Sequence, residues 1–137
     1  MSSLQIFKRS VDGVMILDLK GPIRIGEGNL DLHRVISSLV EQNEKRILLN
    51  LADVTYVDSS GLGELVAGYT SIEKNGGEMK LINLTDRVTE LMMITKLLTV
   101  FDVFDNEPEA IKSFEPDAEK VKTEPLGIPV AKASSII

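Results

Sequence analysis

Short apolar runs alternate with helical stripes along most of the chain, and this alternation limits the possible fold more than any other feature of the sequence. Residues 14–19, 46–51 and 79–82 are short, nearly continuous apolar runs, which are typical of buried strands. Between these runs, apolar residues recur at helical spacing: Leu32, Val35, Ile36, Leu39 and Val40, and then Leu62, Leu65, Val66, Tyr69 and Ile72. Strands that alternate with helices predict an α/β domain with helical crossovers.

Turn and capping residues predict where these elements begin and end. The predicted strands include residues 4–8, 14–19, 46–51, 79–82 and 100–104, with a turn at Asp12-Gly13 and a stop at Gly21-Pro22. The predicted helices are one over 30–42, one that ends at Asn75-Gly76-Gly77, one capped by Asn83 or Thr85, and one opened by Asn106. We therefore expect a mixed β-sheet of about five strands with about four helices, in the order β-β-α-β-α-β-α-β-α.

Proline placement predicts where the folded domain ends. Four of the five prolines lie beyond residue 107, and from residue 115 onward no apolar period is sustained. Such a segment cannot bury enough apolar surface to fold. We expect a domain over residues 1–114 and a flexible C-terminal tail over 115–137, to which we assign no role.

The composition excludes several classes of function. The absence of cysteine excludes a disulfide framework, a thiol nucleophile and a zinc–thiolate site. An aromatic content of 4 % and a net charge of −6 disfavour a nucleic-acid partner. No apolar run approaches the roughly 20 residues of a membrane span, and the N-terminus lacks a signal-peptide core. We expect a soluble, cytoplasmic protein with no cofactor, no metal and no membrane contact.

The segment Tyr56–Glu64, YVDSSGLGE, lies between a predicted buried strand and an amphipathic helix. Asp58, Ser59 or Ser60 could simply cap that helix. A cap needs only one such residue, however, and Gly61 and Gly63 each cost about 1 kcal/mol in a helix relative to alanine. A phosphoryl group would be tolerated at a helix start, and its charge and bulk would block a partner that fits the bare hydroxyl.

Enzymatic interpretations of this segment fail on its residues. A nucleophile elbow needs glycine where Val57 stands, and the Gly61-Leu62-Gly63 segment lacks the third glycine of a dinucleotide fingerprint. There is no P-loop lysine motif. A catalytic triad could use only His33, which we expect to be an exposed polar residue, and Asp53 with Asp58 is too weak a pair for a metal site. We predict a non-enzymatic binding module with a modifiable serine.

At these residues the sequence resembles the STAS domain, and within it the bacterial anti-anti-sigma factors, also called anti-sigma factor antagonists. The resemblance covers roughly residues 4–114. It is carried by LLNLADVTYVDSSGLGE over 48–64, NGGEMKL over 75–81, LTDRV over 84–88, ITKL over 94–97 and Val100-Phe101.

The resemblance implies a function and a set of site residues. Such proteins bind an anti-sigma factor that is itself a serine kinase of the GHKL type, and binding frees a sigma factor for transcription. The kinase would phosphorylate Ser59, with Ser60 as the second choice, and a PP2C-type phosphatase would remove the phosphate. The implied partner surface comprises Asp58, Ser60, Gly61, Leu62, Gly63 and Glu64, together with Gly21, Ile23 and Arg24.

One residue departs from the family pattern. Arg24 stands where many members carry an acid, which puts the identity of the kinase in question more than the fold.

Two alternative functions stay open. The chain could be an unphosphorylated STAS subunit of a larger signalling or lipid-transport assembly, or it could bind a nucleotide at the same helix start.

Overall fold

The computed structural model describes residues 3–114, apart from the side chain of Glu27, and these residues form the predicted succession of elements. The elements are β1 (Gln5–Val11), β2 (Val14–Ile23), α1 (Glu27–Glu41), β3 (Arg46–Val57), α2 (Ser59–Lys74), β4 (Glu78–Ile82), α3 (Asp86–Ile94), β5 (Asp102–Phe104) and α4 (Glu107–Ser113). This order confirms the predicted α/β class. The predicted tail over 115–137 lies outside the described residues.

The strands of the described region form one mixed sheet in the order β1-β2-β3-β4-β5. β1 and β2 are antiparallel and are joined by the predicted tight turn, where Asp12 and Gly13 both have positive φ. β2 to β5 are parallel, so their carboxyl ends lie at the same edge of the sheet. The β2–α1 loop, the start of α2 and the start of α3 all follow this edge.

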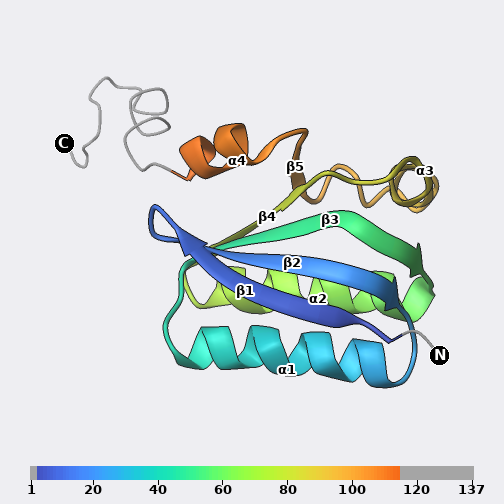
Figure 1. Cartoon of the computed structure of the whole chain (residues 1–137), viewed down its shortest axis with the longest axis horizontal. Coiled ribbons are helices and arrows are strands. Elements are labelled where there is room, and N and C mark those ends of the chain that lie inside the picture. Colours follow the sequence, from blue (N-terminus) through green and yellow to red (C-terminus); the bar gives the residue numbers. More distant parts are fainter. Residues whose placement is uncertain (1–2, 115–137) are drawn as a thin grey trace.

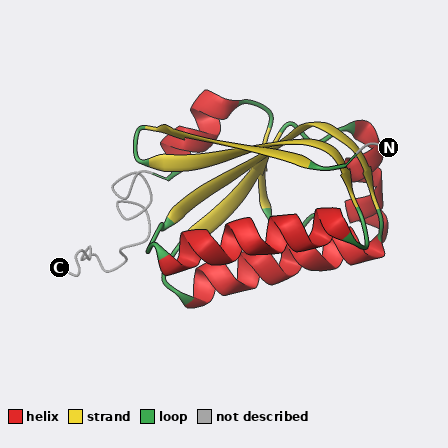
Figure 2. Ribbon diagram, turned by 60° about the horizontal axis from the view of Figure 1, so that its bottom comes forward, coloured by secondary structure: helices red, strands yellow, loops and turns green. Residues whose placement is uncertain are grey.

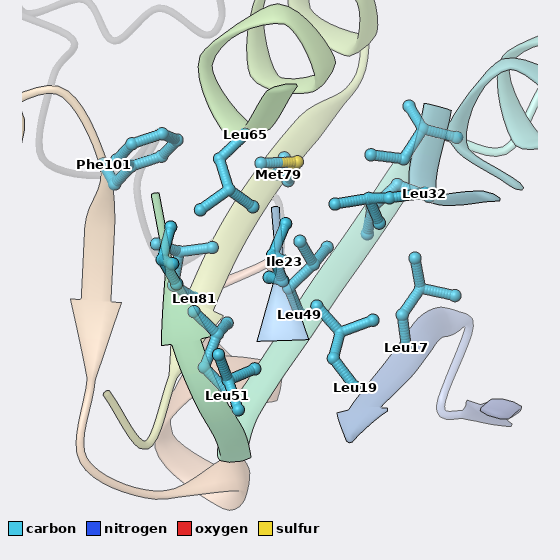
Figure 3. Close-up of a cluster of buried hydrophobic side chains, with 14 of the residues drawn as sticks. Leu17, Leu19, Ile23, Leu32, Leu49, Leu51, Leu65, Met79, Leu81 and Phe101 are labelled. Carbon is cyan, nitrogen blue, oxygen red and sulfur yellow. The ribbon is translucent and has the colours of Figure 1, made fainter. Parts of the chain in front are cut away.

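Helices cover both faces of the sheet. The long helices α1 and α2 lie side by side on one face, and α4 lies on the other (Figures 1 and 2). β3 shows why both faces are buried: Ile47, Leu49 and Leu51 pack in the cluster beneath α1 and α2, whereas Leu48 packs in the cluster beneath α4. Figure 3 shows part of the larger cluster, in which side chains of the central strands meet Leu32 and Leu65 from the two helices.

Several predicted boundaries were wrong at the strand ends. β2 does not stop at Gly21-Pro22 but continues to Ile23, because register shifts on either side of Gly21 let the strand pass the proline. Gly21 has a φ of 108°, and a Cβ there would lie 2.8 Å from the Ser3 carbonyl oxygen. β3 likewise runs on to Val57 and pairs Tyr56 with Pro22. Because both strands are longer than predicted, the β2–α1 loop lies next to the start of α2, where the Asp58 amide donates to the Ile23 carbonyl.

Three smaller differences concern the remaining elements. α1 begins at Glu27 rather than near residue 30, and β5 begins at Asp102 rather than at residue 100. Of the two predicted caps for α3, Thr85 is the one used. Asn83 instead adopts a φ of 59°, and its side-chain amide donates to Asn50 Oδ1 across 3.1 Å.

Candidate functional site

Asp58 holds together the start of α2 and the loop that follows β2. Its Oδ1 accepts a hydrogen bond from the Gly61 amide at 2.7 Å, which makes Asp58 the N-cap of α2. Its Oδ2 accepts a second hydrogen bond, at 3.1 Å, from the Ile25 amide in the β2–α1 loop. Its own amide donates to the Ile23 carbonyl at 3.2 Å. A single residue therefore fixes two segments that are more than 30 residues apart in the sequence.

The same hydrogen bonds keep Asp58 ionised. The Ile25 amide is the main cause that lowers the pKa of Asp58 below its ordinary value, and the Gly61 amide adds to the effect. Desolvation acts in the opposite direction and is outweighed. At neutral pH a fixed carboxylate therefore stands directly before Ser59.

The two glycines of the site have different roles. A Cβ on Gly61 would lie 2.9 Å from the Ile23 carbonyl carbon and closer still to its oxygen, so only glycine allows α2 to approach β2 this closely. A Cβ on Gly63 would have no atom within 4 Å, and Gly63 is exposed. Packing therefore explains Gly61 but not Gly63, which adds no side chain to the exposed surface of α2.

The serines of the first turn of α2 differ in exposure. Ser59, the first residue of the helix, is exposed, and Ser60 is half-buried. One turn further on, Glu64 Oε2 is hydrogen-bonded to His33 Nδ1 of α1 at 3.0 Å. His33 is exposed as predicted.

The predicted site residues lie close to the α2 start, but they divide into supporting and accessible groups. The buried residues are Gly21, Ile23, Gly61 and Leu62; the half-buried residues are Asp58, Ser60 and Glu64; the exposed residues are Arg24, Ser59 and Gly63. The structure therefore separates the predicted partner-surface residues into those that a partner can reach directly and those that support them. The buried four expose little of their own surface and position the backbone that presents Ser59, although Leu62 also lines a groove beside Ser59.

A groove that the sequence did not predict adjoins Ser59. It has a volume of about 550 Å³ and lies between the end of β3, the start of α2 and α3. Ser59 and Leu62 lie on one side, and Arg87, Leu91 and Ile94 of α3 lie on the other. The i, i+4, i+7 spacing of these three α3 residues could have indicated a second face, distinct from the buried stripe of Val88 and Met92.

Large apolar side chains are exposed around the groove and the loop. Ile94 and Tyr56, which line the groove, are 72 % and 44 % exposed. Ile25, whose amide binds Asp58, is 74 % exposed. Apolar side chains gathered around an accessible polar group are typical of a protein-binding surface.

Among residues 3–114, no group of three or more metal-ligating side chains comes together. No helix in this part of the chain is long and apolar enough to span a membrane.

Known proteins are similar to this chain in sequence and in fold. An anti-sigma F factor antagonist of Paenibacillus polymyxa is 27 % identical over 113 residues, which are 82 % of this chain and 97 % of that protein. The crystal structure of a candidate anti-sigma factor antagonist from Thermotoga maritima has a TM-score of 0.74 at 27 % identity, over 80 % of this chain and 93 % of the other. The phosphorylated form of the Bacillus cell fate determinant SpoIIAA has a TM-score of 0.65 at 20 % identity, over 81 % of this chain and all of that one.

The fold and the site together define an α/β domain that presents an exposed serine, beside an ionised aspartate, at a strand-to-helix junction. The family model of the STAS domain matches residues 5–110. The chain belongs to the STAS-domain family.

Proposed function

We propose that this protein is an anti-sigma factor antagonist that acts in the cytoplasm. It binds an anti-sigma factor through the surface around Ser59 and thereby frees a sigma factor for transcription. The observation that carries this proposal is the exposed Ser59 hydroxyl, held at the first position of α2 by the doubly hydrogen-bonded Asp58. The similarity to the Paenibacillus anti-sigma F factor antagonist over nearly its whole length supports the same role.

We further propose that phosphorylation of Ser59 switches this binding. The bound anti-sigma factor, a GHKL-type serine kinase, transfers the γ-phosphoryl group of ATP to Ser59 Oγ. The bond from phosphorus to the leaving ADP breaks, a bond to Oγ forms, and the hydroxyl proton is released. A PP2C-type phosphatase reverses the change with water and yields inorganic phosphate. SpoIIAA, which shares the fold, is known in a phosphorylated form.

Charge at the surface explains why the modified protein would be released. A phosphoryl group adds about −1.5 to −2 charges at pH 7. It would lie next to the Asp58 carboxylate and would occupy the surface that a partner fits when the hydroxyl is bare. Because Ser59 is exposed, the modification requires no rearrangement of the core. The switch therefore changes the surface and leaves the fold intact.

The experiment that tests this function combines the protein with its anti-sigma factor and ATP. We expect one phosphate, mapped to Ser59 by mass spectrometry, in the wild type and in Ser60→Ala but not in Ser59→Ala. We also expect Ser59→Asp to weaken binding of the anti-sigma factor while its circular dichroism matches that of the wild type. Phosphate on Ser60, or no phosphate at all in a protein that still binds, would overturn the proposed switch.

A further inference from the structure

The groove beside Ser59 contains a cation whose role the proposed function leaves open. Arg87 lies in the first turn of α3, is exposed, and lines the groove together with Ser59. Among residues 3–114, no hydrogen bond or ion pair engages its guanidinium. Arg9 binds Asp18 and Glu107, and Arg34 binds Asp31. Arg24 and Arg46 are also without a side-chain partner among residues 3–114, but they do not line the groove.

The other charges on the groove make this cation the only one available to an anion there. The ionisable and charged side chains that line it are Tyr56, Asp58, Arg87 and Glu90. Both carboxylates would repel a phosphate. The Asp58 carboxylate also already accepts the Gly61 and Ile25 amides, so those donors are not free to bind a second anion. Within the groove, only Arg87 can supply a compensating positive charge.

Building on the proposed modification of Ser59, we propose that Arg87 pairs with the phosphoryl group on Ser59 and bridges α3 to the start of α2. A guanidinium presents two parallel N–H donors that match phosphate oxygens, and its long side chain can swing across an open groove. The pair would cover part of the groove floor near Leu62 and Leu91. Phosphorylation would then alter the partner surface twice, by adding charge at Ser59 and by laying the Arg87 side chain across the groove.

The test installs phosphoserine at position 59 by genetic encoding, so that it does not depend on any kinase. The second ionisation of the phosphoserine is followed by 31P NMR across a pH titration. An opposite charge nearby favours the dianion, so we expect the pKa of the phosphate to be higher in Arg87→Gln than in the wild type by about one unit. Arg46→Gln, which changes an arginine at the opposite end of β3, serves as the control and should leave the titration unchanged.

A second measurement detects the bridge itself. Hydrogen exchange should slow at the amides of α3 when Ser59 is phosphorylated, and this slowing should be absent in Arg87→Gln. Identical phosphate titrations and identical α3 exchange in the wild type and Arg87→Gln would overturn the proposal. If Arg24→Gln, rather than Arg87→Gln, shifts the titration, the assignment to Arg87 is also wrong. The results are separable from the proposed function, because a shifted titration stands even if no kinase modifies Ser59.

Discussion

The starts of α2 and α3 follow the same edge of the sheet and begin with the same kind of side-chain cap, yet only the start of α2 presents an exposed serine. Each helix has a side-chain cap that accepts the amide three residues ahead: Asp58 accepts from Gly61 at 2.7 Å, and Thr85 accepts from Val88 at 3.2 Å. Beyond this the two differ. Asp58 uses its second oxygen to hold the β2–α1 loop, whereas Thr85 makes only the local hydrogen bond.

The comparison of the two caps shows which features accompany the exposed serine at the start of α2. At α3 the capping residue starts a helix, and the following turn packs Val88 into the core. At α2 the cap carries a full charge, a second segment is tied to it, and Gly61 lets the helix press against the Ile23 backbone. These contacts rigidly present Ser59, which makes no contribution to the core itself.

The largest expected effect comes from closing the space at Gly61. Gly61→Ala places a methyl group against the Ile23 carbonyl, and neither backbone can yield, so we expect a loss of about 3 kcal/mol or more in the free energy of unfolding. Gly68→Ala is the matched control in the same helix. Its methyl would meet only the Ile36 side chain, and the one close contact, at 2.7 Å, is with Cδ1 at the flexible end of that side chain, so we expect a loss below about 1 kcal/mol. Urea unfolding measures both; equal losses would refute the close contact at Gly61.

A smaller loss in the free energy of unfolding should distinguish the two capping residues, Asp58 and Thr85. Asp58→Ala removes one capping hydrogen bond and one hydrogen bond between segments, and we expect a loss of about 2–3 kcal/mol. Thr85→Ala removes only a capping bond, and we expect a loss of about 1 kcal/mol. If the two substitutions cost the same in urea unfolding, the link from Asp58 to Ile25 contributes nothing to stability.

The charge on Asp58 should make its contribution depend on pH. The pKa of Asp58 is lowered in the folded protein, so its stabilisation is complete above the ordinary value and is lost as the pH falls through the folded value. The difference in unfolding free energy between the wild type and Asp58→Asn should therefore shrink as the pH is lowered. Thr85 does not titrate, so the cost of Thr85→Ala should stay constant over the same range. A constant cost for Asp58→Asn would contradict the assigned hydrogen bonds.

The smallest effect on stability is expected at Gly63, and its sign is opposite. Gly63→Ala introduces a methyl group into open space and a better helix former, so we expect a gain of up to about 1 kcal/mol. The same methyl would project into the proposed partner surface, so we expect weaker binding of the anti-sigma factor in calorimetry. A variant that is more stable and binds equally well would show that Gly63 lies outside the interface.

Local patterns in the sequence predicted the elements but not the contacts between distant segments. The helical spacing of apolar residues predicted α1 and α2, and the apolar run over 46–51 predicted β3. These predictions succeeded because the spacing of apolar residues along an element depends on which of its faces is buried. The extension of β2 past Pro22 was not predicted, since a bulge depends on the partner strand as well as on the residues themselves.

At the candidate site, too, local sequence patterns predicted residues but not contacts between distant segments. Asp58 and Ser59 stood out because their motif is continuous in the sequence. The binding of Asp58 to the Ile25 amide and the presence of Arg87 on the same groove join segments about 30 residues apart, and no local pattern reports such contacts. Likewise, only the position of the Ile23 backbone distinguishes Gly61, which must be glycine, from Gly63, which has room for a side chain.

The central claim is that α2 presents a partner surface whose affinity is set by the charge on Ser59. Isothermal titration of the anti-sigma factor with the unmodified protein and with the protein carrying phosphoserine at position 59 tests it most directly. We predict that the phosphorylated protein binds at least about tenfold more weakly, which corresponds to about 1.4 kcal/mol, with an unchanged fold by circular dichroism. Equal affinity of the two forms would contradict the claim.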